Sequence, residues 1–294
     1  MPGGLLRLPA EQLEHAFSAY AAAVAAKRRR TALGLLCLLL AIALAGVAGE
    51  VDLVKFASNI DRFPNYIRSL VPDLSWSNFG VDVAEWFWNL DVWLELLADT
   101  LLIAYLGTLL GAVGGFFVCF LASANLEPRS PIRFLARRFL EFCRTVPEIV
   151  FALLFVVAFG LGAMPGVLAL AIHSIGALGK LFAEVVENID MRPVEGATAT
   201  GANRVQTIHF AVLPQVASNF TSYALLRFEI NVRTAAVMGF VGAGGIGQEL
   251  LVAIRKFYYT DVSAILLLIL ATVMVIDLVT EQVRHRLIGI ERRP

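Results

Sequence analysis

The stretch TLLIAYLGTLLGAVGGFFVCFL, residues 100–121, contains no charged side chain. At a rise of about 1.5 Å per residue, a helix of this length is about 33 Å long, enough to cross the roughly 30 Å hydrocarbon core of a bilayer. A second uncharged run of similar length, TALGLLCLLLAIALAGVAG, lies at residues 31–49. Because a backbone in lipid must satisfy its own hydrogen bonds, both runs predict transmembrane helices.

The composition of the 294-residue chain extends this prediction to the whole protein. Hydrophobic residues make up 58% of the chain and charged residues 16%, against about 45–50% and about 25% in soluble domains. A soluble core of this size cannot enclose so much apolar surface. With 24 Lys plus Arg against 24 Asp plus Glu, the chain has no net positive field for binding nucleic acid. We therefore expect an all-α integral membrane protein.

Further apolar stretches bring the predicted number of transmembrane helices to six. Basic residues collect before the first run and between the second and third, whereas residues 50–99 are mostly acidic. By the positive-inside rule this pattern predicts that both termini are cytoplasmic, although Arg255 and Lys256 are exceptions. The predicted spans lie near residues 31–49, 100–121, 139–162, 166–186, 210–241 and 262–280 of a transmembrane domain 31–294, with an outside loop 50–99 and a cytoplasmic loop 187–209.

Residues 1–30 form a separate cytoplasmic N-terminal segment in this scheme. Leu13, Phe17, Tyr20 and Val24 recur at helical spacing, which fits either an amphipathic helix on the inner membrane surface or a plain solvated helix. Thirty residues before an apolar run are too many for a usual secretory leader, so we expect the first span to remain attached.

Polar residues interrupt the fifth predicted span at Arg227, Glu229, Asn231 and Arg233. An ionised side chain at mid-bilayer costs about 2.5–3.5 kcal/mol even on lenient scales, so each needs a compensating partner. Glu229 and Arg233 are four residues apart and are expected to pair on one helical face. Arg227 needs a partner from another helix, another subunit or a passing anion. Two interpretations remain open: an ion-pair network between helices, or an anion pathway or gate.

A glycine-rich segment, Gly242-Ala-Gly-Gly-Ile-Gly247, follows this span and matches the dinucleotide-binding fingerprint letter for letter. That fingerprint requires a βαβ unit, for which there is no room between two membrane spans. Gly242, Gly244, Gly245 and Gly247 instead predict a break in a helix, at a pathway or gate or at a simple turn. The sequence contains no P-loop, no metal-ligand spacing and no catalytic triad order, so we expect no catalytic residue and no metal site.

The cytoplasmic loop carries the most specific motif. Glu195-Gly-Ala-Thr-Ala-Thr-Gly201 is followed, after nine residues, by Ala211-Val-Leu-Pro214. This pattern resembles the EAA loop of ABC-importer permeases, with Gly196 in place of the first Ala and Ala211 in place of an Ile. The resemblance implies a short helix that docks on a separate ATPase and a turn at Gly201. The implied coupling residues are Glu195, Gly196, Ala197, Gly201, Leu213 and Pro214.

Three other stretches narrow the resemblance: Arg144–Ala152, Gly179–Glu184 and Phe228–Arg233 leading to the glycine-rich segment. They are similar to permeases of phosphonate and phosphite importers, and the similarity covers roughly residues 95–283. It implies a type I ABC-importer permease in a bacterial inner membrane, which is a transport subunit and not an enzyme. The implied partners are a second copy of the chain, two ABC ATPase subunits and an external substrate-binding protein. The chain would bind no cofactor itself, since ATP and Mg would bind the ATPase.

Alternative functions remain open. Methionine-importer permeases share the loop and a similar glycine run, so a methionine-type or phosphate importer remains an alternative. A passive anion channel would need neither an ATPase nor the spacing of the loop motif. A membrane enzyme subunit would need paired acid/base groups or metal ligands, and the sequence shows neither pattern.

Overall fold

The computed structural model describes residues 10–291, and within that range all regular elements are helices. This agrees with the predicted all-α class. The chain divides into two units, residues 1–66 and 67–294, which we describe separately.

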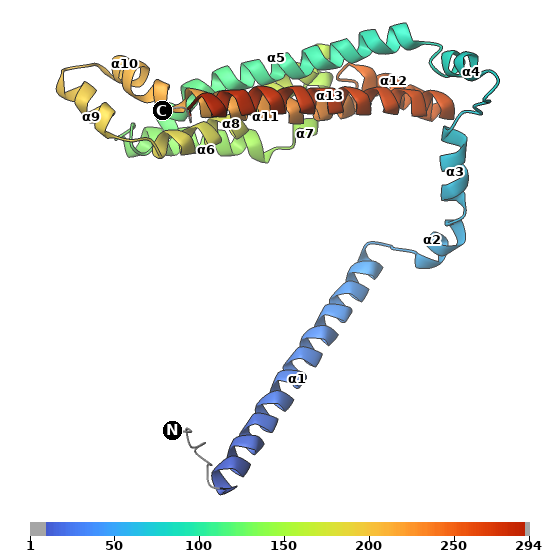
Figure 1. The fold of residues 1–294 in the computed structure, drawn as a ribbon, viewed down its shortest axis with the longest axis horizontal. Coiled ribbons are helices and arrows are strands. Elements are labelled where there is room, and N and C mark those ends of the chain that lie inside the picture. The colour runs from blue at the N-terminus through green and yellow to red at the C-terminus, as the bar shows by residue number, and fades with distance from the viewer. Residues whose placement is uncertain (1–9, 292–294) are drawn as a thin grey trace, which may run out of the picture. The chain divides into compact units, whose positions relative to one another are not determined.

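The first unit is dominated by one long helix, α1 (Ala10–Ala48). Its apolar part, Tyr20–Ala48, is long and apolar enough to cross a membrane and includes the first predicted span. The segment 11–26 enters this part without a break, so the structure has no separate surface helix there (Figure 1). Residues 1–9 lie outside the described part of the chain. Two short helices follow, α2 (Leu53–Asn59) and α3 (Arg62–Leu70), and the latter continues into the second unit.

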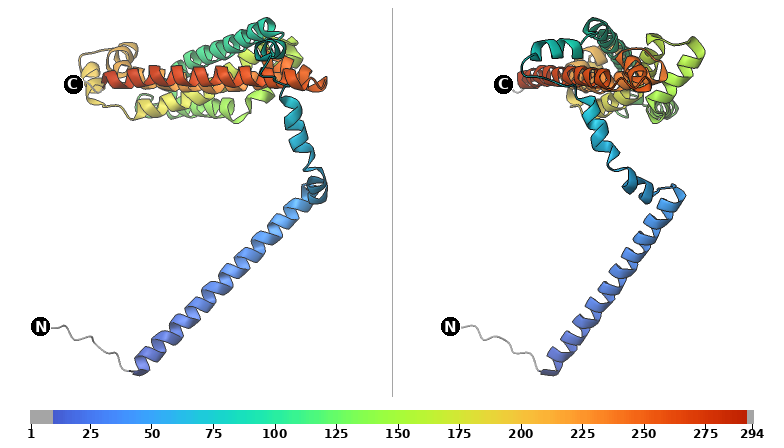
Figure 2. Two further views of the ribbon diagram at one scale, coloured as in Figure 1. Left: turned by 45° about the vertical axis from the view of Figure 1, so that its right-hand side comes forward. Right: turned by 90° about the vertical axis from the view of Figure 1, so that its right-hand side faces the viewer.

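The second unit is a bundle whose long helices, α5, α6, α8, α11 and α13, run alongside one another (Figures 1 and 2). The short helices α9 and α10 lie at one end of the bundle, where α13 also ends, and α4 and α12 lie at the opposite end. The helices are α4 (Phe79–Trp86), α5 (Leu90–Ala122), α6 (Ser130–Thr145), α7 (Glu148–Phe159), α8 (Ala163–Glu187), α9 (Arg192–Ala199), α10 (Arg204–Thr207), α11 (Leu213–Met238), α12 (Ile246–Arg255) and α13 (Tyr259–Glu291).

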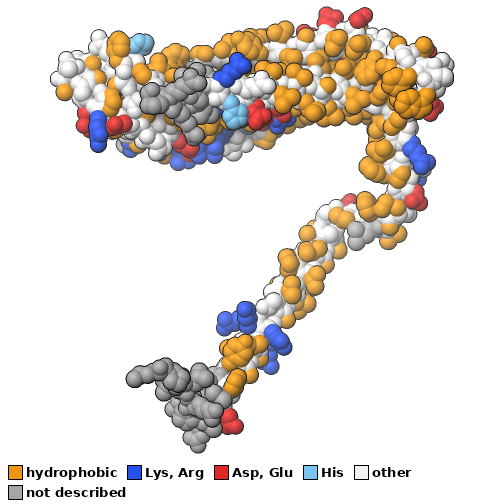
Figure 3. Space-filling model, viewed as in Figure 1, with side chains coloured by type: hydrophobic (Ala, Val, Ile, Leu, Met, Phe, Trp, Pro, Cys, Tyr) orange, Lys and Arg blue, Asp and Glu red, His pale blue; other side chains and the backbone are white. Residues whose placement is uncertain are grey.

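Four helices of the described chain are each long and apolar enough to span a membrane: the apolar part of α1, and α5, α8 and α13. Two bent pairs, α6 with α7 and the Arg204–Val241 segment with α12, raise the number to six if each pair is one span. Apolar side chains cover most of the visible face of the bundle, as expected for a surface in contact with lipid (Figure 3). The predicted count of six is thus compatible with this architecture.

The structure differs from the prediction at the third span. The segment expected as one helix near residues 139–162 is two helices, which meet at an angle of 84°. Val146 is extended, with φ −74° and ψ 122°, and Pro147 follows it. A proline disfavours the helical region for the preceding residue and cannot donate a backbone hydrogen bond, which explains the break. Helix α5 begins at Leu90, ten residues before the predicted span at 100–121.

Close packing between α5 and α8 forms the centre of the bundle. A Cβ added at Gly107 would lie 2.6 Å from Cβ of Leu170, and one added at Gly115 would lie 2.9 Å from the backbone nitrogen of Gly179. Glycines therefore let the two backbones approach closely, as small residues do between membrane helices. Nearer the end with α9, Phe182 of α8 stacks on Phe220 of α11 with ring centroids 4.0 Å apart. These contacts hold α5, α8 and α11 together around the polar groups described next.

Candidate functional site

The predicted coupling segment forms the short helix α9, which ends in a glycine turn. Gly201 has φ +86°, a conformation that favours glycine. Its backbone N–H donates to the carbonyl of Thr198 at 3.0 Å, and the N–H of Ala202 donates to the carbonyl of Ala197 at 3.1 Å. This pair of bonds is a Schellman motif, which satisfies the last carbonyls of the helix. The turn expected at Gly201 is therefore present.

The two sides of α9 have different surroundings. Val194 is buried, and Ala197 is half-buried against the same hydrophobic core, which contains Phe182. Glu195 and Gly196 are exposed, and a Cβ added at Gly196 would meet no atom within 4 Å. Glu195 and Gly196 are therefore accessible to a partner protein, whereas Ala197 attaches the helix to its own bundle.

Leu213 and Pro214 lie on the helical segment that follows α9. It begins at α10, where Asn203 and Gln206 form a capping box, and continues through a π-helical turn, Ile208–Val212, into α11. Pro214 is in the first turn of α11, where its missing N–H is tolerated beside the wider π turn. Leu213 is half-buried in the core below α9. Both residues belong to the segment of the bundle against which α9 packs, and neither lies on the exposed side of α9.

An ion pair joins this segment to the loop between α5 and α6. Arg204 Nη1 donates to Glu127 Oε2 at 2.5 Å, and Arg204 Nη2 donates to the carbonyl of Phe120 at 3.3 Å. The Glu127 side chain is only 1% exposed, and its Oε1 accepts from the backbone N–H of Arg129 at 3.1 Å. The hydrogen bond from Arg204 holds the pKa of the Glu127 carboxyl below its ordinary value. Glu127 is therefore an ionised group that fixes α10 to the end of α5.

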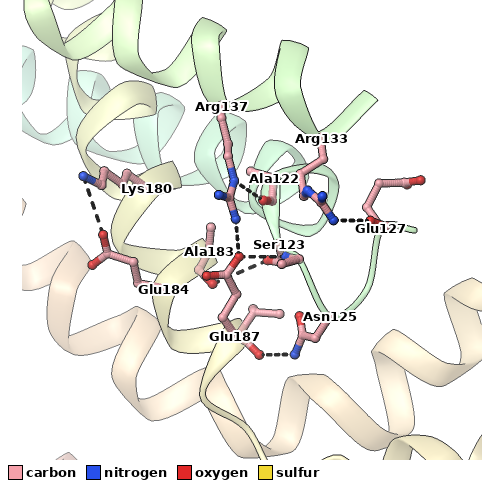
Figure 4. A network of polar contacts seen from close by, with 12 residues as sticks. Ala122, Ser123, Asn125, Glu127, Arg133, Arg137, Lys180, Ala183, Glu184 and Glu187 are labelled. Carbon is pink, nitrogen blue, oxygen red and sulfur yellow. Dashed lines mark hydrogen bonds and ion pairs between the residues drawn. The ribbon is translucent and has the colours of Figure 1, made fainter. Parts of the chain in front are cut away.

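A second polar group ties α8 to the same loop (Figure 4). Arg137 of α6 donates to Glu187 Oε1 at 2.5 Å and to the carbonyl of Ala122 at 2.9 Å. Glu187 also accepts from the backbone N–H of Ala124 at 2.7 Å, and Asn125 donates to the carbonyl of Val186 at 2.7 Å. The ends of α5, α6, α8 and α10 are thereby linked by charged or side-chain hydrogen bonds. We call this set of contacts the end network.

We expect Glu127→Gln to lower energy-driven transport severalfold without loss of the fold. The amide can keep one hydrogen bond to Arg204 but loses the ionic attraction, which is strong for a charge-assisted bond. The measurement is solute uptake by the complete transporter in liposomes, with thermal unfolding of the same sample. Glu141→Gln is the matched control, since Glu141 pairs with Arg138 on the exposed surface of α6. Equal uptake by both variants would show that the Glu127–Arg204 pair has no part in transport.

The charges predicted inside the fifth span form an ion-pair group. Arg233 donates to Glu229 at 2.5 Å, which confirms the pair expected from their spacing. It also donates to both carboxylate oxygens of Asp277 on α13 at 3.1 Å. One guanidinium therefore faces two carboxylates. Arg233 is therefore fully compensated by acidic side chains of α11 and α13.

Arg227 and Asn231 face the interior of the bundle. Arg227 Nε donates to Ser174 Oγ at 3.0 Å, and Asn231 donates to Thr108 Oγ1 at 2.8 Å and to Ser174 Oγ at 2.9 Å. The partner that Arg227 needed thus comes from α8. In the part of the chain that the structure describes, Arg227 Nη2 and Asn231 Oδ1 are buried without a partner. This polar group could still bind a water molecule or an anion.

Glu148, at the start of α7, lies beside these charges. Its Oε2 is 3.1 Å from His173 Nδ1, and Thr234 donates to its Oε1 at 3.5 Å. Glu148, Arg233 and Thr234 belong to the wall of an open hollow of about 380 Å³ on the surface of α7 and α11. Sequence reasoning missed Glu148, His173 and Asp277, because each lies on a different helix from the polar pattern of α11.

The glycine-rich segment forms a buried turn between α11 and α12. Gly242, Gly244 and Gly245 have φ of +82°, +84° and +77°. The N–H of Gly162 donates to the carbonyl of Gly242 at 3.0 Å, and Thr100 Oγ1 accepts from the N–H of Ile246 at 2.9 Å. Residues 243–247 are all buried in the bundle. Their surroundings favour the simple-turn interpretation over a glycine-lined path.

Comparison with known proteins identifies the family to which this chain belongs. Residues 107–288 match the family of binding-protein-dependent transport system inner membrane components. The chain belongs to this family. It is a multi-pass membrane protein of the inner membrane and a transport component, not an enzyme. Among residues 10–291, no group of His, Cys, Asp or Glu could hold a metal ion.

Individual proteins that are similar to this chain are also transport permeases. The phosphite transport system permease protein PtxC of Stutzerimonas stutzeri is 46% identical over 185 residues, which cover 63% of this chain and 67% of PtxC. HtxC, a transport system permease protein of the same organism, is 31% identical and covers 92% of this chain and 91% of its own. The inward-facing MetNI methionine ABC transporter superposes with a TM-score of 0.57 at 18% identity, over 66% of this chain and 95% of the matched chain. The fold is therefore that of type I ABC-importer permeases.

Proposed function

We propose that the chain is the membrane-spanning permease subunit of an ATP-driven importer for phosphite- or phosphonate-type anions. The observation that carries the proposal is the 46% identity to PtxC, a phosphite transport permease. The matched length includes more than half of each chain, whereas the methionine transporter is only 18% identical. The higher identity to PtxC supports the proposal that this chain and PtxC transport the same class of solute.

Coupling to separate ATPase subunits is proposed to occur through α9. The exposed Glu195 and Gly196 form its contact surface, while Val194 and Ala197 hold the helix on the bundle. Gly201 ends the helix and returns the chain to α10. ATP and Mg would bind the ATPase, and its closure would push on α9. The end network would carry that displacement into α5, α6 and α8.

Two copies of the chain are proposed to form the path. The hollow beside Glu148, Arg233 and Thr234 is open on the surface of one chain, so a second copy related by a twofold axis could close it. An external substrate-binding protein would deliver the anion to this dimer. In this arrangement α9, α10 and the C-terminal end of α13 face the cytoplasm, since they lie at one end of the bundle (Figure 2).

The proposal is tested with the cognate external binding protein, purified with the complete transporter. We expect that binding protein to bind phosphite or a phosphonate more tightly than phosphate or methionine, and the transporter to accumulate the same solute with ATP. Preference for methionine or phosphate would favour the corresponding importer. Solute flux without an ATPase would instead favour a passive channel.

We expect Arg233→Ala to lower uptake while leaving assembly with the ATPase intact. The substitution removes the bonds that join α11 to α13 and leaves Glu229 and Asp277 without a cation. The measurement is the initial uptake rate, together with copurification of the ATPase. Unaltered transport at normal expression would remove Arg233 from the pathway.

A further inference from the structure

Arg144 lies in the last turn of α6, next to the break that separates this helix from α7. Helix α6 runs antiparallel to the second half of α8. Arg137 pairs with Glu187 at the end of α8, and a Cβ added at Gly179 would lie 2.5 Å from Cδ2 of Leu140. At the far end of α6, a Cβ added at Gly176 would lie 2.6 Å from the backbone nitrogen of Arg144.

This register sets the depth of Arg144. Gly176 is the fourteenth of the 25 residues of α8, a helix that is long and apolar enough to span a membrane. It therefore lies near the midpoint of a helix that crosses the roughly 30 Å hydrocarbon core. Ser174, which binds Arg227 and Asn231, lies only two residues from Gly176. Arg144 is therefore at the same level as the interior polar group, near the middle of the membrane.

The Arg144 side chain is exposed, and no ion pair or hydrogen bond holds it within residues 10–291. An arginine exposed to lipid at this depth costs at least about 2.5–3.5 kcal/mol, so such residues face a protein interior or a water-filled cavity. The exposed side of Arg144 is therefore a wall of the transport path rather than of the lipid surface.

Other charges surround this position. His173 Nδ1 lies 3.1 Å from Glu148 Oε2 and 3.3 Å from the carbonyl of Val146, which is two residues after Arg144. The next residue, Ser174, accepts from Arg227 Nε at 3.0 Å. Glu148 is the one carboxylate in this set, against two guanidinium groups, and it is already bonded to His173 and Thr234. Arg227 keeps one buried nitrogen without a partner in the described chain. Near the break between α6 and α7, two guanidinium groups therefore accompany one carboxylate, which leaves a net positive charge. Around Arg233 there is no such net positive charge, because one guanidinium faces two carboxylates.

We propose that Arg144, together with Arg227, binds the phosphorus oxyanion as it passes the middle of the membrane. A guanidinium presents parallel N–H donors that match two oxygens of a phosphorus oxyanion. The proposal rests on the proposed function and names the site within it. Arg233, neutralised by Glu229 and Asp277, holds α11 to α13 and is not the anion ligand.

The test uses the complete transporter with its ATPase and binding protein in liposomes, and phosphite and methylphosphonate as probes. We expect Arg144→Gln to lower uptake by about 10- to 100-fold, the loss typical of one charge-assisted contact. Most of the loss should be in the solute concentration for half-maximal uptake. Arg144→Lys should recover part of it, since it keeps the charge. ATPase copurification and ATP hydrolysis without solute should not change.

Arg138→Gln is the matched control, because Arg138 is exposed on the same helix and paired with Glu141. Equal losses in Arg138→Gln and Arg144→Gln, or normal uptake in Arg144→Gln, would overturn the proposal. So would separation of the two copies in Arg144→Gln, which would make Arg144 an interface residue. A transporter whose unaltered form accumulates neither probe would contradict the proposed function itself, which is a distinct outcome.

Discussion

The double variant Glu195→Arg with Gly201→Asp is expected to reduce ATP-driven uptake by more than about 100-fold. Glu195 is exposed on α9, and reversal of its charge would oppose whatever cationic group it meets on the ATPase, at a cost of several kcal/mol. Asp at position 201 must adopt φ +86°, which strains the turn that ends α9. The measurements are uptake into liposomes and copurification of the ATPase.

Its control is Glu281→Arg, a charge reversal at an exposed carboxylate near the end of α13. That variant should retain uptake and bind the ATPase normally. The thermal stability of the permease alone should change little in Glu281→Arg, because that side chain is exposed, and should fall only by the strain of the turn in the double variant. If the double variant still takes up solute with ATP, α9 is not the docking element.

The substitution Gly247→Ala is expected to destabilise the permease by about 3 kcal/mol or more, at the upper end for overpacking. The added Cβ would overlap the carbonyl oxygen of Ala236 and would lie 3.2 Å from Cα of Gly239, so it meets backbone from α11 and the following turn. Backbone cannot rotate away as a flexible side chain can. The check is a thermal unfolding scan of the purified protein, with a fall in Tm of at least about 6 °C.

Gly196→Ala serves as the comparison, because that position is helical and has no neighbour within 4 Å. It should be neutral or slightly stabilising, since alanine favours a helix by about 0.5–1 kcal/mol over glycine. Similar Tm values for the two variants would mean that the contact between α11 and α12 is looser than the structure has it.

Features with a local cause were predictable from the sequence. Uncharged runs indicate membrane helices because lipid excludes alternatives. The Glu229–Arg233 pair follows from a spacing of four residues on one helix, and the turn at Gly201 follows from the conformation that only glycine adopts easily. Each of these depends on residues within one helix or one turn.

Features that depend on packing were not predictable in this way. Asp277 reaches Arg233 from 44 residues away, and Arg204 reaches Glu127 across 77. The depth of Arg144 depends on the register of α6 against α8, which a count of charges in a loop cannot give. The predicted span at residues 139–162 runs through Pro147, where the structure instead has an 84° bend between α6 and α7.

The inward attachment of α9 has a consequence for protein engineering. Val194 and Ala197 are constrained by the permease's own core, whereas Glu195 and Gly196 have no such constraint. If α9 is the docking helix, as proposed, a chimaera intended to pair this permease with a different ATPase subunit needs changes only at these outward positions.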